Sequence, residues 1–161
     1  MGVMMRSLGT LGVAAVAWVV CVAPAVAQTD QSGRTYDLSQ PPARITVVDF
    51  AAAWCQPCWK SLPHLQSLAT RMPEVDVLVV SIDEKVDGRD QLVDRIGLTL
   101  PVIWDANHAI AEQFKPQAMP ATFVLDTDGT VIYSHLGYDQ ETWDTFVRFL
   151  DRMPAAETPA R

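Results

Sequence analysis

The chain has 161 residues, 49% of them hydrophobic, and its formal net charge is −7 at pH 7. Such a length suits one domain with a buried core and is too short for two domains of ordinary size. The negative charge disfavours binding to the phosphates of nucleic acids or to anionic lipid surfaces, so we assign it to solubility.

The first 27 residues have the three parts of a secretory signal peptide in the usual order. Arg6 is the only charged side chain in this region, residues 8–23 are apolar, and the small-x-small sequence at 25–27 is a cleavage site. The alternative is a retained membrane anchor, although the apolar stretch is shorter than the roughly 20 residues that span a bilayer. We expect cleavage after Ala27 and export, to the periplasm of a Gram-negative host.

The remaining sequence alternates between strand and helix patterns. Polar residues at 28–43 form a lead-in segment with a short strand around 34–38, and the Ala- and Pro-rich residues 154–161 form a disordered tail. Val- and Ile-rich or extended stretches predict strands at 44–50, 75–82, 100–104, 121–126 and 130–135. Helical patterns lie at 58–71 (interrupted by Pro63), 89–96, 107–115 (capped by Asp105 or Asn107) and 140–153.

These elements predict an α/β fold. The strands at 44–50 and 75–82 are apolar on both faces, as central parallel strands are. The turn at 126–129 ends in Asp128-Gly129 and joins the last two strands into a β-hairpin. Parallel strands with crossover helices, followed by a hairpin, give a central mixed sheet flanked by helices.

The sequence Trp54-Cys55-Gln56-Pro57-Cys58 lies between the strand at 44–50 and the helix that follows it. A Cys-x-x-Cys pair at a strand-to-helix junction is typical of a thioredoxin-type redox site, where two thiols close and reopen a disulfide. A disulfide over two intervening residues adds little stability, because the stabilisation grows with loop length. A purely structural disulfide is therefore the weaker alternative.

Metal binding is a second alternative for the two thiols. The third cysteine, Cys21, lies in the expected signal peptide, and His64, His108 and His135 show no paired ligand spacing. A zinc or copper site needs further sulfur or nitrogen ligands. We therefore expect no metal, and no cofactor besides the redox-active disulfide itself.

The residues from Val48 to Cys58, with Pro63 five positions later, resemble the active site of the thioredoxin superfamily. The Met-Pro-Ala sequence at 119–121 resembles the second signature of that superfamily, in which a cis-proline precedes a strand. The inserted region 100–115 is similar to the TlpA/ResA-like branch of exported thiol–disulfide oxidoreductases. The resemblance implies a thioredoxin fold at residues 44–153, with the inserted segment before the final hairpin.

The resemblance also implies that Cys55 is the nucleophile and Cys58 the resolving thiol. The helix N-terminus favours the Cys55 thiolate. This thiolate attacks a partner disulfide to form a mixed disulfide, and Cys58 then releases the reduced partner. Gln56 and Pro57 set the geometry and electrostatics of the ring. The absence of a histidine between the cysteines favours a reductant.

Further residues receive expected roles from the same resemblance. Asp49 is a buried acid whose pKa rises by desolvation, and it either carries the proton that Cys58 loses or has no kinetic role. Pro120 is a cis-proline that faces the disulfide and leaves the Met119 backbone free to pair with a substrate strand. Trp54 covers the disulfide and contacts the partner, or else it is a core tryptophan.

Two positions depart from the family patterns: Ser61, where cytochrome-maturation members often carry Glu, and Ala51, where thioredoxins usually carry Trp. Cytochrome c maturation is therefore one option among several envelope thiol pathways. We expect a monomeric exported thiol–disulfide oxidoreductase that reduces disulfides of exported proteins and is re-reduced by a membrane thiol donor. The alternatives are a protein disulfide oxidase or isomerase on the same fold, and a copper-handling thiol module.

Overall fold

The computed structural model describes residues 28–41 and 43–153 of the protein. The expected signal peptide at 1–27 and the expected tail at 154–161 lie outside these ranges. Within the described ranges, no helix combines the length and apolarity needed to cross a membrane.

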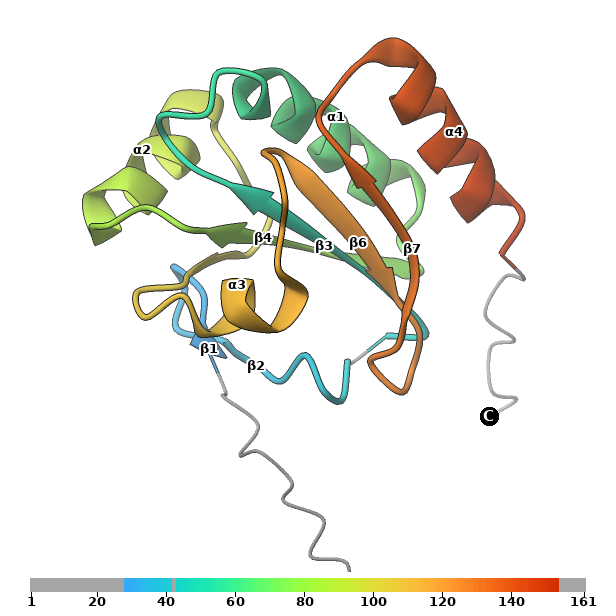
Figure 1. Cartoon of the computed structure of the whole chain (residues 1–161), viewed down its shortest axis with the longest axis horizontal. Helices are drawn as coiled ribbons and strands as arrows, with labels where there is room; N and C mark the ends of the chain where they lie inside the picture. The colour runs from blue at the N-terminus through green and yellow to red at the C-terminus, as the bar shows by residue number, and fades with distance from the viewer. Residues whose placement is uncertain (1–27, 42, 154–161) are drawn as a thin grey trace, which may run out of the picture.

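Five strands form the central sheet: β3 (Ile45–Ala51), β4 (Val75–Ser81), β5 (Val102–Trp104), β6 (Ala121–Leu125) and β7 (Val131–Leu136). Their spatial order is β5-β4-β3-β6-β7 (Figure 1). β3 is parallel to β4 and β4 to β5, whereas β6 runs antiparallel to β3 and β7 antiparallel to β6. This arrangement confirms the expected mixed sheet with an antiparallel hairpin at one edge.

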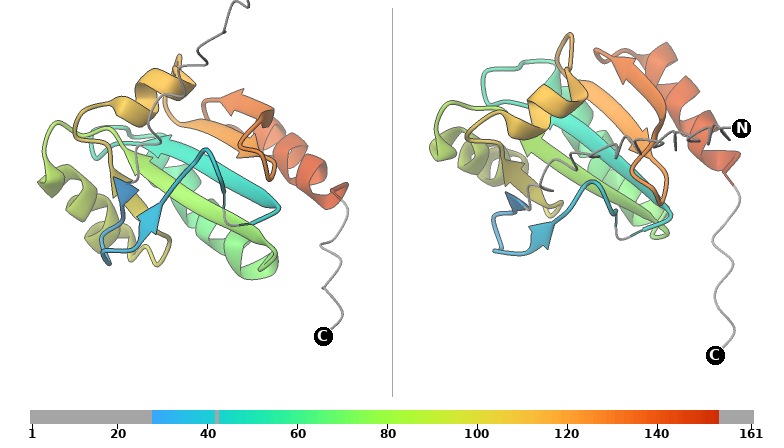
Figure 2. Two further views of the ribbon diagram at one scale, coloured as in Figure 1. Left: turned by 90° about the horizontal axis from the view of Figure 1, so that it is seen from below. Right: turned by 60° about the horizontal axis from the view of Figure 1, so that its bottom comes forward.

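Helices cover both faces of the sheet. They are α1 (Cys58–Arg71), α2 (Val86–Ile96), α3 (Ala109–Phe114) and α4 (Gln140–Asp151). α1, α2 and α4 lie on one face and α3 on the other, as Figure 1 and Figure 2 show from different sides. Alternate residues of β3 serve the two faces: Val47 packs in the cluster with α1, while Val48 and Phe50 pack in the cluster with Ile110 of α3. Burial on both faces is the reason why β3 is apolar at nearly every position.

The helix α1 has the predicted bounds, but the predicted interruption at Pro63 is wrong, because the helix is continuous through this residue. The proline ring removes one backbone hydrogen bond from the helix interior. Leu62, Leu65 and Leu68 of the same helix are buried in the core. We attribute the continuity of the helix to this apolar contact with the sheet.

Two other helices differ at their ends from the sequence prediction. α2 begins at Val86 rather than at 89 and ends at Ile96 as predicted. Gly97 follows it, and its φ of 67° is the left-handed conformation typical of a helix C-cap. α3 is shorter than predicted, because His108 before it and Lys115 after it have φ angles of 54° and 50°. Left-handed residues cannot continue a right-handed helix, so they set both ends of α3.

The lead-in residues pack against the edge of the sheet. β1 (Gln28–Thr29) and β2 (Thr35–Tyr36) form a small antiparallel hairpin, drawn in blue in Figure 2. Asp30, next to β1, forms an isolated β-bridge with Ile103 of β5. The side-chain amide of Gln31 donates to one backbone carbonyl beside β5 at 2.9 Å and accepts from the first N–H of β5 at 2.6 Å. These contacts occupy backbone groups at the β5 edge that would otherwise be free for another strand.

Candidate functional site

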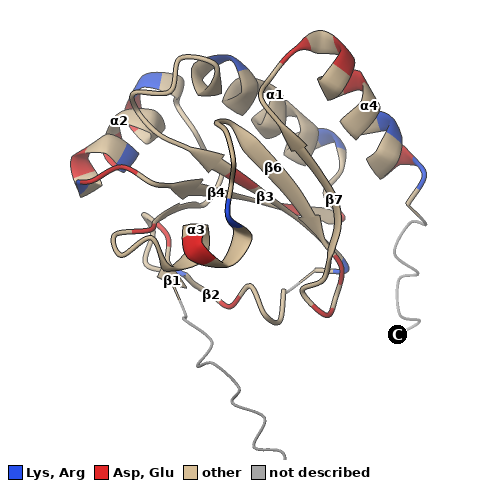
Figure 3. Cartoon of the chain, viewed as in Figure 1, with Lys and Arg blue, Asp and Glu red and all other residues tan. Residues whose placement is uncertain are grey.

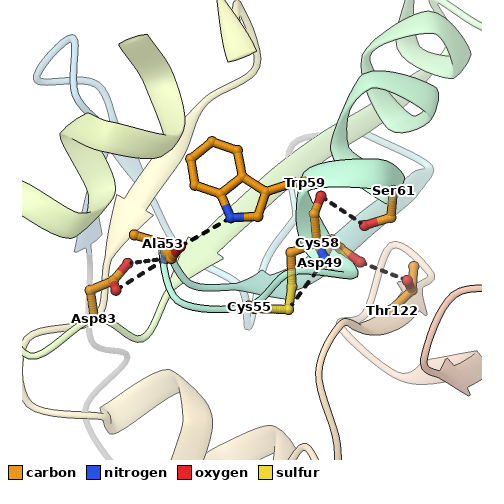
Figure 4. The surroundings of a disulfide bond; sticks show 8 residues. All are labelled: Asp49, Ala53, Cys55, Cys58, Trp59, Ser61, Asp83 and Thr122. Atoms are coloured by element: carbon orange, nitrogen blue, oxygen red, sulfur yellow. Dashed lines mark hydrogen bonds between the residues drawn. A yellow bond between two sulfur atoms is a disulfide. The ribbon is translucent and has the colours of Figure 1, made fainter. Parts of the chain in front are cut away.

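Cys55 and Cys58 form a disulfide at the N-terminus of α1, with their Cα atoms 5.3 Å apart (Figure 4). The backbone N–H of Cys58, the first residue of the helix, donates to Cys55 Sγ at 3.3 Å. A Cys55 thiolate at this place lies at the positive end of the helix dipole and next to an N–H donor, and both favour the thiolate. Cys58 is fully buried and Cys55 is 4% exposed, so accessibility favours Cys55 as the attacking sulfur.

The residues around the disulfide differ sharply in exposure. Trp54 is 64% exposed, and Gln56 and Pro57 are exposed as well. The alternative that Trp54 is a core tryptophan is therefore wrong. Its exposure next to the buried Cys55 suits a side chain that meets a partner, and this role stays a prediction.

Asp49 lies in the middle of β3 and is completely buried. The Thr122 hydroxyl donates to Asp49 Oδ1 at 2.7 Å, while Asp49 Oδ2 has no hydrogen-bond partner among the described residues. Desolvation raises the pKa of Asp49 from 3.8 to about 7, although the Thr122 bond opposes this shift by stabilising the carboxylate. Strand alternation puts Asp49 on the face that α1 covers, because Val47 and Ala51 pack in one cluster with Cys58. A buried acid with a pKa near 7 can both accept and release a proton at neutral pH.

The peptide bond between Met119 and Pro120 is cis. Pro120 immediately precedes β6, whose first residue, Ala121, pairs with Phe50 near the end of β3. The Cys-x-x-Cys sequence also follows the end of β3, so Pro120 and the disulfide belong to the same edge of the sheet. Met119 is half-buried and packs against both core clusters. Pairing of its backbone with a substrate strand stays a prediction.

Asp83, two residues after the last residue of β4, was not among the predicted site residues. The carboxylate of Asp83 accepts the backbone N–H of Ala53, with N···O distances of 3.1 and 3.0 Å to its two oxygens. On the other side of the same residue, the indole N–H of Trp59 donates to the Ala53 carbonyl at 3.0 Å (Figure 4). Because the carboxyl ends of parallel strands meet at one edge of a sheet, the position of Asp83 after a buried strand was a signal that could have identified it.

Charge is distributed differently in the helices and in the sheet. Figure 3 shows acidic and basic residues interspersed on α2 and α4, while Asp49 is the acidic residue within β3. In the part of the chain that the structure describes, no group of three or more His, Cys, Asp or Glu residues could hold a metal ion.

Comparison with known proteins identifies the family of this chain. The model of the AhpC/TSA family matches residues 19–134. The chain belongs to the AhpC/TSA family. Among solved structures, a Chlorobium tepidum protein provisionally named thiol:disulfide interchange protein DsbE superposes with a TM-score of 0.72, at 22% identity, over 80% of this chain and 92% of that chain. This similarity confirms the thioredoxin-like fold.

The chain is also similar to proteins named thiol-disulfide oxidoreductase ResA, which confirms the expected resemblance to that branch. It is 27% identical to the protein of Geobacillus kaustophilus over 111 residues, 68% of this chain and 64% of the relative. It is 32% identical to the protein of Oceanobacillus iheyensis over 106 residues, 65% of this chain and 54% of the relative. The matched region thus spans between about half and two thirds of these relatives.

Proposed function

We propose that the protein is a thiol–disulfide oxidoreductase that reduces disulfides in exported proteins through Cys55 and Cys58. The observation that carries this proposal is the disulfide between these residues at the N-terminus of α1, next to the exposed Trp54. The names of the ResA relatives support the reaction class. Export is supported by the signal-peptide pattern at residues 1–27.

The reaction transfers two electrons from the dithiol form of the protein to the substrate. The Cys55 thiolate attacks one sulfur of the substrate disulfide, which forms a mixed disulfide and releases the first substrate thiolate. Cys58 loses its proton and attacks Cys55 Sγ, which releases the second substrate thiolate and closes the Cys55–Cys58 disulfide. Asp49 accepts the Cys58 proton in this proposal, since its pKa of about 7 allows it to be ionised at neutral pH.

A second electron transfer must return the protein to the dithiol form. The compartments to which signal peptides lead are oxidising, so a dedicated thiol donor in the membrane is the expected source of these electrons. The protein acts as a monomer in this scheme. Cytochrome c maturation is one pathway that needs such a reductant, and the substrate cysteines of that pathway would be the partner.

Serine variants of the two cysteines test the proposal. Cys55→Ser is expected to abolish the reduction of insulin disulfides, because the attacking sulfur is gone. Cys58→Ser is expected to accumulate mixed disulfides through Cys55, because nothing resolves them; non-reducing gels and mass spectrometry of the exported fraction detect them. Full insulin reduction by Cys55→Ser would contradict the assignment, and so would a Cys58→Ser protein that traps no partner.

The direction of electron flow is tested by equilibrating the Cys55–Cys58 couple with glutathione. A reductant should have a reduction potential near or below about −220 mV, in the range of glutaredoxins and thioredoxin. A potential near about −120 mV, the value of a strong oxidant, would assign the protein to disulfide formation instead.

A further inference from the structure

In the segment that precedes the disulfide, both backbone polar groups of Ala53 bond to side chains that lie outside the segment. The Ala53 N–H donates to the Asp83 carboxylate, which comes from the loop after β4, and its carbonyl accepts the indole N–H of Trp59 in α1 (Figure 4). These contacts approach Ala53 from two different elements. We refer to them as the Asp83–Ala53–Trp59 network.

The Asp83 carboxylate is itself held in place. Asp83 is 5% exposed, and the Ser81 hydroxyl donates to its Oδ2 at 2.9 Å. Its backbone carbonyl accepts the indole N–H of Trp104 at 2.8 Å. A Cβ atom on Gly88 would collide with the Asp83 side chain, so α2 approaches the carboxyl group so closely that glycine suits this position. Asp83 therefore presents its oxygens to Ala53 from one defined position.

The orientation of the Ala53 peptide governs the two residues that follow it. Trp54 points outward with 64% exposure, whereas Cys55 is 4% exposed and its N–H donates to Ala52 O at 3.0 Å. If the Ala53 peptide rotated, both the indole of Trp54 and the sulfur of Cys55 would move. An error of about 1 Å in the placement of a reacting group can cost up to about 100-fold in rate.

We propose that Asp83 is a positioning residue which, through the Asp83–Ala53–Trp59 network, holds Cys55 in its reactive place at the N-terminus of α1. Asp83 does not touch the sulfur or the substrate, and it acts through the Ala53 backbone. The inference rests on the proposed function, since it concerns the nucleophile of that reaction. It adds a residue from the loop after β4 to a site that the local sequence around the cysteines otherwise defines.

Three variants separate positioning from a general loss of stability. Asp83→Ala removes the acceptor of the Ala53 N–H, whereas Asp83→Asn keeps one carbonyl oxygen in the same place. Asp94→Ala is the matched control, because it removes an exposed carboxylate from the neighbouring helix α2. Near-UV circular dichroism at 25 °C identifies the variants that are folded.

The readout is the rate of alkylation of Cys55 by iodoacetamide in the reduced protein, followed from pH 5 to pH 9 by mass spectrometry. We expect Asp83→Ala to lower this rate by up to about 100-fold. Asp83→Asn should stay within about fivefold of the wild type, because a neutral acceptor bonds the amide more weakly than a carboxylate does. Asp94→Ala should match the wild type at every pH. The proposal would be overturned if folded Asp83→Ala were alkylated at the wild-type rate. It would also be overturned if Asp83→Ala and Asp83→Asn lowered the alkylation rate equally.

Trp59→Phe provides an independent test if Asp83→Ala does not fold. The substitution keeps an aromatic ring but removes the donor to the Ala53 carbonyl, so it should also slow the alkylation of Cys55. An unchanged rate in this variant would overturn the proposal. Alkylation requires no disulfide substrate, so the failure of wild-type protein to reduce insulin would remove the proposed function without deciding the role of Asp83.

Discussion

Asp49 is the residue at which burial and charge conflict most strongly. It is completely buried, and one of its oxygens has no hydrogen-bond partner among the described residues, so its pKa rises from 3.8 to about 7. Between these two values the unfolded chain has released the proton while the folded chain still binds it. The free energy of unfolding therefore falls as the pH rises from about 4 to about 7.

Asp49→Asn should remove this pH dependence, because asparagine has nearly the same shape and does not ionise. At pH 4 the variant and the wild type should be similar in stability. Above pH 7 the variant should be more stable by on the order of 4 kcal/mol, at about 1.4 kcal/mol for each pH unit between the two pKa values. Urea unfolding of the oxidised proteins at several pH values measures the difference.

The control for this measurement is Asp94→Asn, which neutralises an exposed carboxylate on α2. Its stability relative to the wild type should show little change over the same pH range, because solvent screens an exposed charge. If the difference in unfolding free energy between Asp49→Asn and the wild type also showed little change with pH, the pKa of Asp49 in the folded protein would be close to its ordinary value. Asp49 would then be too weak a base to take the proton from Cys58 as proposed, because an ordinary carboxylate with a pKa of about 4 is hardly protonated at neutral pH.

At the scale of single elements, α3 depends on a side chain that lies outside the helix. Asp105 is completely buried and accepts the N–H groups of Ile110 at 3.1 Å and of Ala111 at 2.8 Å. The helix α4 has a comparable cap in the exposed Asp139, which accepts the Thr142 N–H at 2.8 Å. The two caps make similar hydrogen bonds but differ in their access to water.

This difference predicts unequal costs for the two alanine variants. Asp139→Ala should lower the free energy of unfolding by about 1 kcal/mol, the usual value for an N-terminal cap whose freed N–H can bond water. Asp105→Ala should cost about 3 kcal/mol, because it also leaves buried donors without a partner. Thermal and urea unfolding compare the two. Equal losses of unfolding free energy in Asp105→Ala and Asp139→Ala would show that water reaches the N–H groups at the start of α3.

The elements predicted best from the sequence are those whose structure follows from the residue pattern within the element itself. β3 and α1 follow from apolar periodicity, and the cysteine pair follows from its spacing at their junction. The left-handed conformations of His108 and Lys115 do not follow from their residue types, since neither type requires a positive φ, and the predicted α3 was therefore too long. Asp83 and Thr122 were missed because their roles come from hydrogen bonds to residues far along the chain, Ala53 and Asp49.

At the scale of the whole molecule, the lead-in residues contribute to the core on the face opposite the disulfide. Tyr36 and Leu38 are buried and pack in the cluster with Phe50, Ile103 and α3. The disulfide belongs to the other cluster, with α1 and α4. Stability and redox chemistry should therefore respond differently to the loss of the lead-in residues.

A chain that begins at residue 44 should be less stable than one that begins at residue 28. The loss should be at least about 3 kcal/mol, because two large side chains leave the core and each contributes about 1.5–3 kcal/mol by burial. Gln31→Ala in the longer chain isolates the contribution of the β5 edge and should cost about 1 kcal/mol. The folded fraction of the shorter chain should keep the reduction potential of the Cys55–Cys58 couple, since the cluster around the disulfide is intact. A shift of about 30 mV or more, which corresponds to about 1.4 kcal/mol, would show that the two faces of the sheet are coupled.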